Sequence, residues 1–244
     1  MKTIAVWVAK GGTGKSSTTG NLVYELRKRG RVLAIDADPQ GNLSSWIHPK
    51  QFEHELADVL TGAVQLADAI LSVREGLDLL PTFAIGGGLK EWAETKLYGK
   101  PQAFTRLIRD ISGLGYEYTV FDMSPGASLL ERSIVAAVDE ALPILRPEIF
   151  SVDGLEVFVE TLNEIRNDLG GRVASSRLVV NGLNRSMPVH LSYADSLAGK
   201  GREVFIIPQS ARITNAQTDH VFLAEYAPAD KPLNEYARLA EAVG

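Results

Sequence analysis

The feature that most constrains this chain is the segment at residues 10–17, which reads KGGTGKSS. A short apolar run at residues 3–8 precedes it and predicts a buried strand. Apolar residues recur at helical spacing after it, within residues 18–29, and predict a helix. A glycine-rich turn between a strand and a helix, ending in Gly-Lys-Ser, is typical of a phosphate-binding loop. The alternative, a turn that binds nothing, leaves that ending unexplained.

Each part of this segment has a physical role in holding a phosphate chain. The glycines leave room for backbone N–H groups around phosphate oxygens, and the helix N-terminus adds partial positive charge. Lys15 is expected to reach the β- and γ-phosphates, and the Ser16 hydroxyl to ligate Mg²⁺. The expected cofactors are therefore ATP and Mg²⁺. The loop residues expected to bind ATP are Lys10, Gly11, Gly12, Thr13, Gly14, Lys15, Ser16 and Ser17.

Lys10 distinguishes this loop from the common pattern, which has a glycine where this chain has Ala9. One nucleotide can be held without a second lysine at the start of the loop. The loop resembles the deviant Walker A motif of the ParA/MinD superfamily, whose extra lysine reaches across a dimer to the nucleotide of the other subunit. The resemblance implies that Lys10 is catalytic, together with Lys15. A solvated surface lysine is the alternative.

Carboxylates follow two further predicted strands. Residues 32–35 predict a strand that leads into DADPQGN at residues 36–42, and residues 118–122 predict a strand that ends in Asp122. Open α/β sheets bind ligands at the carboxyl ends of their strands. Carboxylates there can order Mg²⁺-bound water or orient an attacking water. An acidic turn without chemistry is the alternative for residues 36–42.

The sequence D-x-D-P-Q-G-N resembles the switch I segment of Soj-type ParA proteins. The resemblance implies that Asp38 positions the hydrolytic water and is catalytic, and that Asp36 supports the metal site. In phosphate-loop ATPases, the aspartate that ends the other strand binds a Mg²⁺-ligating water or the loop hydroxyl. Asp122 therefore joins Ser16 and Asp36 in the expected metal site. The family usually continues with Cys-Pro-Pro-Ser, whereas residues 123–126 here read MSPG.

The rest of the chain alternates between predicted strands and helices. Strands are expected at residues 76–82, 140–145, 177–181 and 203–208, and helices at residues 56–60, 67–71, 102–112, 131–138, 153–169 and 233–243. The glycines at 86–88 are expected to form a loop. This alternation predicts an α/β fold with a doubly wound, mostly parallel sheet flanked by helices, the phosphate-loop NTPase fold. We expect a single ATPase domain over residues 1–244, without an N-terminal DNA-reading domain, because the chain starts directly with its first strand.

Two segments near the C-terminus resemble the base-binding part of the family. In similar proteins, the asparagine at the end of the strand at 177–181 bonds the adenine edge, which implies that role for Asn181. An asparagine that caps its own turn is the alternative. The Ile-Pro that ends the strand at 203–208 matches the pair that flanks the base, which implies that Pro208 contacts ATP. The next loop keeps Arg212 and Ala216 of the Soj pattern Arg-x-x-Glu-Ala-Pro-Ser, but not its Glu, Pro and Ser.

Composition limits the classes of function that remain. The chain has no cysteine, which excludes disulfides, thiolate zinc sites and the bridging cluster of a reductase like the nitrogenase iron protein. It contains no apolar run near the ~20 residues of a membrane span, and no signal-peptide pattern. A cytoplasmic location is therefore expected. Residues 235–244 carry one arginine and two glutamates, which disfavours a MinD-like helix that binds membranes.

Basic residues gather in one region although the net charge of the chain is −5. Residues 161–215 hold seven basic and four acidic residues, a local balance of +3. Surface basic residues are usually only solvated, but as a set these can meet a phosphate backbone. Arg185 and Arg212 lie where Soj-like proteins carry arginines that contact DNA.

The resemblance to Soj-type ParA proteins extends over nearly the whole chain. It implies a nucleoid-associated ATPase of DNA segregation that forms a homodimer on ATP binding, binds DNA non-specifically and is stimulated by a ParB-like centromere-binding protein. No membrane partner is expected. The alternatives are a positioning ATPase for a protein complex, a conjugation factor or a secretion factor, a MinD-like membrane ATPase, and a small-molecule phosphate-loop enzyme.

Overall fold

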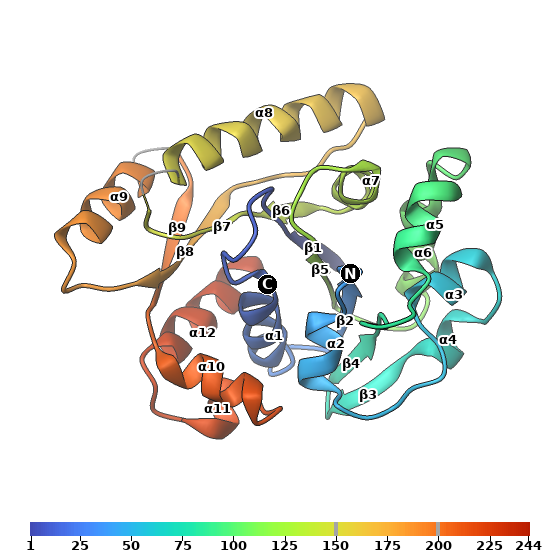
Figure 1. Cartoon of the computed structure of the whole chain (residues 1–244), viewed down its shortest axis with the longest axis horizontal. Coiled ribbons are helices and arrows are strands. Elements are labelled where there is room, and N and C mark those ends of the chain that lie inside the picture. The colour runs from blue at the N-terminus through green and yellow to red at the C-terminus, as the bar shows by residue number, and fades with distance from the viewer. Residues whose placement is uncertain (149–150, 199–200) are drawn as a thin grey trace.

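The computed structural model describes residues 1–148, 151–198 and 201–244. Its strands are β1 (Lys2–Val6), β2 (Val32–Ala37), β3 (Leu71–Arg74), β4 (Leu77–Leu80), β5 (Tyr118–Met123), β6 (Glu140–Leu142), β7 (Ile144–Leu145), β8 (Arg177–Leu183) and β9 (Glu203–Pro208). Six of them form one sheet in the order β3-β4-β2-β5-β1-β6, and the others form a second sheet in the order β7-β8-β9 (Figure 1). Within the described ranges, every strand pair except β3–β4 is parallel. The expected mostly parallel α/β fold is confirmed.

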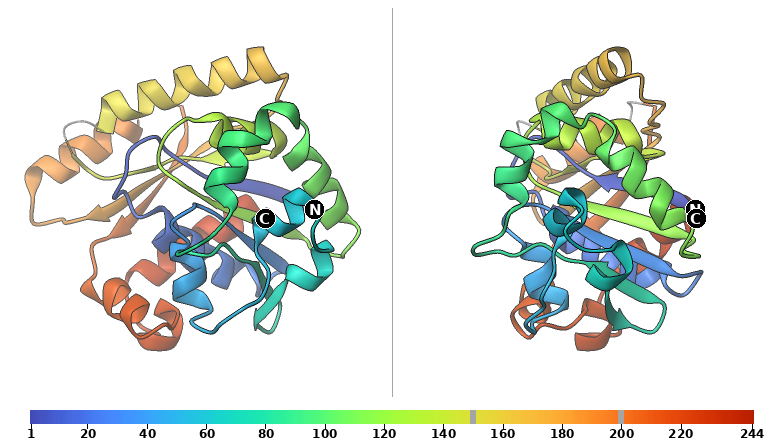
Figure 2. Two further views of the ribbon diagram at one scale, coloured as in Figure 1. Left: turned by 45° about the vertical axis from the view of Figure 1, so that its right-hand side comes forward. Right: turned by 90° about the vertical axis from the view of Figure 1, so that its right-hand side faces the viewer.

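Helices cover both faces of these sheets. They are α1 (Lys15–Leu26), α2 (Asn42–Ile47), α3 (Leu56–Thr61), α4 (Leu66–Ala69), α5 (Leu89–Thr95), the 3-10 helix η1 (Leu97–Gly99), α6 (Ala103–Ser112), α7 (Leu129–Ala137), α8 (Ser151–Leu169), α9 (Pro188–Ala198), α10 (Ala211–Thr218), α11 (Leu223–Tyr226) and α12 (Pro232–Val243). Both views of Figure 2 show α8 on the opposite side of the molecule from α10 and α11.

The alternation of side chains along β1 explains this two-sided arrangement. Ile4 and Val6 belong to a core that includes residues of α1 and α12, whereas Ala5 and Trp7 belong to a core that includes residues of α6, α7 and α8. Successive side chains of a strand point to opposite faces, so a strand that is apolar at every position must be covered on both. The continuous apolar run at the N-terminus therefore lies at the centre of the fold.

The strand expected at residues 140–145 is divided into β6 and β7 by Pro143. A proline has no N–H to donate to a neighbouring strand, so it interrupts the ladder. The Pro143 carbonyl still accepts a hydrogen bond from the Val179 N–H at 3.0 Å. β6 pairs with β1 and β7 pairs with β8, so the proline marks the passage of the chain from the first sheet to the second.

Several elements were not predicted from the pattern of apolar residues. The helical turn expected at residues 67–71 is α4, and Leu71 already belongs to β3, a short edge strand. The helix α9 was missed because its apolar residues do not keep to one face: Ala194 and Leu197 are buried, while Val189 and Leu191 are exposed. The glycines at residues 86–88 form a loop, as expected.

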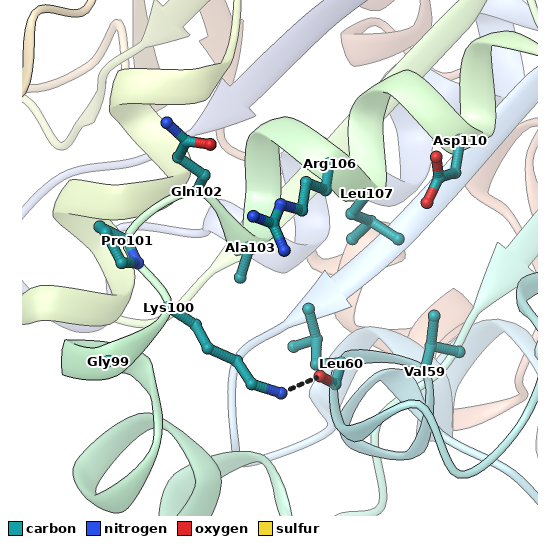
Figure 3. Close-up of a pocket in the computed structure, with 10 residues that line it drawn as sticks. All are labelled: Val59, Leu60, Gly99, Lys100, Pro101, Gln102, Ala103, Arg106, Leu107 and Asp110. Carbon is teal, nitrogen blue, oxygen red and sulfur yellow. Dashed lines mark hydrogen bonds between the residues drawn. The ribbon is translucent and has the colours of Figure 1, made fainter.

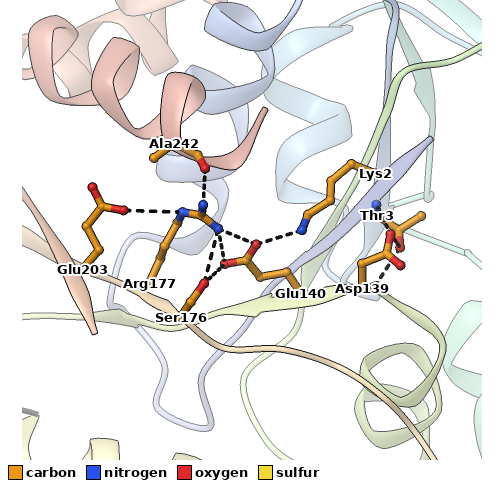
Figure 4. Close-up of polar contacts among 8 residues, drawn as sticks. All are labelled: Lys2, Thr3, Asp139, Glu140, Ser176, Arg177, Glu203 and Ala242. Carbon is orange, nitrogen blue, oxygen red and sulfur yellow. Dashed lines mark hydrogen bonds and ion pairs between the residues drawn. The ribbon is translucent and has the colours of Figure 1, made fainter. Parts of the chain in front are cut away.

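A buried carboxylate joins the two sheets to the C-terminal helix (Figure 4). Glu140 of β6 is 1% exposed and accepts hydrogen bonds from Arg177 of β8 at 2.7 and 2.8 Å. The ammonium of Lys2 in β1 lies 3.2 Å from the same carboxylate. Arg177 also donates to the carbonyl of Ala242 in α12. One carboxylate thus neutralises two cations that lie far apart in the sequence, Lys2 and Arg177.

We expect Glu140→Gln to lower the free energy of unfolding by about 3 kcal/mol, because it leaves two cations without their shared counterion. Urea denaturation followed by circular dichroism measures this change. Glu241→Gln is the matched control, since Glu241 forms an exposed ion pair with Arg29 at 3.6 Å, and exposed pairs contribute little. Equal unfolding midpoints for the two variants would contradict the proposed role of Glu140.

Candidate nucleotide site

Three adjacent strands bring the phosphate loop and the acidic segments together. In the sheet, Asp122 of β5 is in register with Val6 of β1 on one side and with Asp36 of β2 on the other. Because all three strands are parallel, the segments that follow them meet at one edge of the sheet. These segments are the phosphate loop, the segment that contains Asp38, and the segment that begins at Ser124.

Glycines shape the phosphate loop itself. Gly12 and Gly14 have φ angles of 71° and 92°, in the left-handed region that favours glycine. A Cβ atom at Gly14 would lie 2.1 Å from the Asn181 amide nitrogen, so a larger residue would clash with β8. That amide donates to the Thr13 carbonyl at 2.8 Å. The Asn181 side chain therefore contacts the phosphate loop and not its own turn.

Lys15 is the first residue of α1 and is only 7% exposed. Its ammonium donates to the Lys10 carbonyl at 3.2 Å, which folds the side chain back along the loop. Burial lowers the pKa of Lys15 below its ordinary value. Three carboxylates oppose this shift, those of Asp122, Asp38 and Glu131. The cation thus sits in a pocket of negative charge at the carboxyl edge of the sheet.

Asp122 lies behind the phosphate loop and is fully buried. Its Oδ1 accepts a hydrogen bond from Thr19 at 2.9 Å. Its Oδ2 is buried, and no described residue donates a hydrogen bond of good geometry to it. Burial raises the pKa of the Asp122 carboxyl, and the hydroxyls of Ser16 and Thr19 oppose that shift. An unsatisfied carboxylate oxygen beside Ser16 fits a site for a cation or its bound water.

Asp36 and Asp38 occupy different positions in the segment after β2. Asp36 Oδ2 accepts hydrogen bonds from both the N–H and the hydroxyl of Ser44, each at 2.7 Å, so it anchors the start of α2. Burial, followed by the charge of Asp122, raises the pKa of Asp36. Asp38 Oδ1 accepts from the Gln40 N–H at 2.9 Å, and its side chain lines the cavity above Lys15. Burial raises the pKa of Asp38 as well.

The cavity above the phosphate loop has a volume of about 530 Å³. Seven residues expected at the site line it, namely Gly11, Gly12, Gly14, Lys15, Ser16, Ser17 and Asp38. Seven further lining residues were not predicted, namely Gln40, Asn42, Ser45, Trp46, Pro125, Gln217 and His220.

Gln217 and His220 come from the C-terminal part of the chain. The Gln217 amide donates to the Ser17 hydroxyl at 3.0 Å, and His220 Nδ1 lies 3.0 Å from the Ser45 carbonyl. The Trp46 indole donates to the Val221 carbonyl at 2.9 Å. These contacts join residues 175 to 200 positions apart, so no local sequence pattern signals them.

Other expected site residues lie outside this cavity. Lys10 and Thr13 line a smaller cavity of about 140 Å³ with Arg146 and Glu148, and the Lys10 ammonium is 3.4 Å from Glu148 Oε2. Asn181 contacts the back of the loop through Thr13, whereas Pro208 lines a separate groove.

The residues expected to bind DNA occupy the side of the molecule near that groove. Arg185 lines the groove together with Pro208, Lys231 and Arg238. Arg212, at the start of α10, lies 3.6 Å from Asp230. Two other basic residues of the segment 161–215 are not assigned to this surface. Arg177 is paired with the buried Glu140, and Lys200 lies outside the described residues.

A further cavity of about 290 Å³ lies between α3 and α6 (Figure 3). The Lys100 ammonium donates to the Leu60 carbonyl at 3.3 Å across it. Arg106 and Asp110 come to it from α6. The cavity contains none of the residues expected to bind nucleotide or DNA.

Comparison with known proteins identifies the family. The family described as AAA domain (AAA_31) matches residues 1–174. The chromosome-partitioning ATPase Soj of Thermus thermophilus is 30% identical over 247 residues, which cover 100% of this chain and 95% of the relative. The chromosome partitioning protein ParA of Caulobacter vibrioides is 32% identical over 228 residues, which cover 88% of this chain and 84% of that protein.

A solved structure agrees with these relatives. The septum site-determining protein MinD of Pyrococcus horikoshii, in complex with Mg-ADP, superposes with a TM-score of 0.81 at 25% identity, covering 99% of this chain and 95% of that one. Three findings point to the same family: the matched family model, the two relatives, and the additional lysine of the phosphate loop. The chain belongs to the AAA_31 family and is a phosphate-loop ATPase of the ParA/MinD superfamily, related to the Soj and ParA partitioning ATPases.

Proposed function

We propose that this chain is a DNA-segregation ATPase that forms a homodimer when it binds ATP, binds DNA without sequence preference and is stimulated by a ParB-like centromere-binding protein. It acts as a single ATPase domain over residues 1–244, in the cytoplasm and on the nucleoid. The observation that carries the proposal is the position of Lys10, at the start of a phosphate loop that already contains a buried lysine, Lys15. Similarity to Soj over the whole chain supports it.

ATP would occupy the cavity above the phosphate loop, with its terminal phosphates near Lys15. Mg²⁺ would be held by the Ser16 hydroxyl, with Asp122 behind it and Asp36 as a support. The buried, unsatisfied Oδ2 of Asp122 supports this assignment. When bound, Mg²⁺ would neutralise part of the phosphate charge. The assignment of Asn181 and Pro208 to the base rests on the family resemblance alone, since neither residue lines this cavity.

Asp38 would orient the water that attacks the terminal phosphate. Its carboxylate is 6% exposed and lines the same cavity as Lys15, and the Gln40 N–H holds one of its oxygens. A fixed acceptor near the phosphate end of the cavity supports such a role, since phosphoryl transfer depends mainly on positioning and electrostatics.

Lys10 would act across the dimer. In the single chain its ammonium contacts Glu148, which also binds Arg146 at 3.1 Å. Lys10 and Glu148 are both about half exposed, so their ion pair is weak and can be exchanged for a phosphate. Two ATP molecules buried face to face repel each other, and a lysine from each subunit would offset that repulsion.

A membrane-bound alternative has less support. The helix α12 buries Tyr236, Leu239 and Val243 against the domain, so its apolar face is already covered. Across the described ranges, no helix combines the length and apolar character needed to cross a bilayer.

We expect Lys10→Ala to bind ATP as a monomer and fail to dimerise, because the cation that crosses the interface is removed. Light scattering with Mg-ATP measures the mass, and calorimetry measures ATP binding. Lys15→Ala is the contrasting variant, expected to lose ATP binding itself. A Lys10→Ala protein that dimerises as the parent does would refute the cross-subunit role.

We expect Asp38→Ala to bind Mg-ATP but to hydrolyse it at least about 100-fold more slowly, because the attacking water loses its acceptor. The variant should then accumulate as the ATP-bound dimer. Phosphate release under single-turnover conditions gives the rate. If the rate equals that of the parent, another residue positions the water.

The groove at the C-terminal side offers a surface for a phosphate backbone. It has a volume of about 900 Å³ and contains Arg185, Lys231 and Arg238, against one carboxylate, that of Glu235. Glu235 is paired with Arg238 at 2.8 Å. A single chain offers few contacts, whereas a dimer doubles them. Binding is therefore expected to need ATP and to weaken steeply with salt.

We expect the double variant Arg185→Ala, Arg212→Ala to dimerise with ATP but to lose most of its affinity for random duplex DNA. Each lost phosphate contact should lower the slope of log affinity against log salt by ~0.9. Gel shifts with ATP and increasing salt test this. Arg109→Ala is the control, since Arg109 pairs with Asp110 on α6, on the other side of the molecule (Figure 1). If the parent dimer binds no DNA, a protein-cargo positioning ATPase becomes the better account.

A further inference from the structure

The segment at residues 124–128 is held by a buried carboxylate from the helix that follows it. Glu131 is 4% exposed. Its Oε1 accepts a hydrogen bond from the Ser124 hydroxyl. Its Oε2 accepts from the Ser128 hydroxyl at 2.5 Å and from the Ser128 N–H at 2.8 Å. One carboxylate therefore closes the segment at both ends.

The middle of the segment is fixed from the phosphate-loop side. The indole of Trp7, which is buried at the end of β1, donates to the Gly126 carbonyl at 2.7 Å. Pro125 lies between these fixed points and lines the nucleotide cavity. A Cβ atom at Gly11 would lie 3.9 Å from the Pro125 ring, in ordinary contact. The segment therefore sets one wall of the cavity, next to the loop.

The family usually has a second proline where this chain has Ser124. A proline would restrict the backbone by its ring, whereas a serine leaves the backbone free and offers a hydroxyl. Only a carboxylate at position 131 can accept hydrogen bonds on both oxygens, one from each serine. An amide in its place accepts only on its oxygen, but its NH2 group can donate to a serine hydroxyl, so a glutamine can reverse one contact and keep the other.

We propose that Glu131 is a positioning residue for ATP hydrolysis, which acts through Ser124 to hold Pro125 against the phosphate loop. The proposal builds on the ATP site proposed above. The Glu131 carboxylate also interacts electrostatically with Lys15 and Asp38, so it belongs to the same group of charged side chains as the proposed ATP site. The rival account is that Glu131 only caps α7, through a capping box with Ser128.

The two accounts predict different results for the two serines. Ser128→Ala removes the cap of α7 but leaves the contact between Ser124 and Glu131. Ser124→Ala removes that contact and leaves the cap. Ser124→Thr restores the hydroxyl and is the conservative variant. For each protein the measurements are kcat and KM for Mg-ATP, together with the melting temperature.

We expect Ser124→Ala to lower kcat ~10-fold or more with KM within about two-fold, because a displaced wall harms the reacting geometry more than binding. Ser124→Thr should keep kcat within about two-fold of the parent. Ser128→Ala should lower the melting temperature by several degrees, as expected for a lost cap, with kcat nearly unchanged. Glu131→Ala should lower kcat at least as far as Ser124→Ala does, because it also removes the contact with Ser124. Adding Ser124→Ala to Glu131→Ala should cause no further loss of kcat, because both substitutions remove the same contact.

Three results would overturn the proposal: an unchanged kcat in Ser124→Ala, an equal loss of kcat in Ser128→Ala, or additive losses of kcat when Ser124→Ala and Glu131→Ala are combined. A variant that fails to fold is recognised by its melting curve. The kcat values of the remaining variants then test the proposal. Hydrolysis by the parent is measured first. If the parent protein binds no ATP, the proposed nucleotide site is wrong. If the parent hydrolyses ATP and Ser124→Ala hydrolyses it at the same rate, only the proposed role of Glu131 is wrong.

Discussion

The site depends on one buried cation among buried carboxylates. Lys15 is nearly inaccessible to water, and Asp122, Asp38 and Glu131 all lie close enough to act on it. A buried charge is tolerated only when it is paired and hydrogen-bonded, so the surrounding segments must be held firmly. Ser44 holds Asp36, the Gln40 N–H holds Asp38, and Ser124 bonds Glu131. The group contains more acidic than basic side chains, and burial raises the pKa of Asp36, Asp38 and Asp122, so a bound metal ion would favour their ionised forms.

The central part of this site could be predicted from the sequence because it follows local rules. Glycines before a Gly-Lys-Ser ending predict a phosphate loop, and apolar runs that end in aspartate predict carboxylates at one edge of a parallel sheet. The structure confirms the fold and brings Lys15, Ser16 and Asp38 to one cavity, with Asp36 and Asp122 in register behind it. Strand β1 was recognisable because Ile4, Ala5 and Val6 are apolar without alternation, as in a strand covered on both faces.

The remainder could not be predicted because it depends on long-range contacts. Gln217 contacts Ser17 across two hundred residues of sequence, and the segment around Gln217 departs from the family pattern. Glu131 looks like an ordinary capping residue until its second oxygen is seen to bind Ser124. Pro143 was expected within one strand, but whether a proline bends a strand or divides it between two sheets depends on the available partners.

The contact between Ser17 and Gln217 also has a consequence for how the protein matures in the cell. Chains are synthesised from the N-terminus, and their parts fold as they emerge. The phosphate loop is synthesised about two hundred residues before the segment around Gln217 and His220, which forms one wall of its cavity. A nascent chain therefore carries an incomplete cavity until the segment around Gln217 and His220 has been synthesised. The timing of synthesis thereby separates the appearance of the loop from the completion of its cavity.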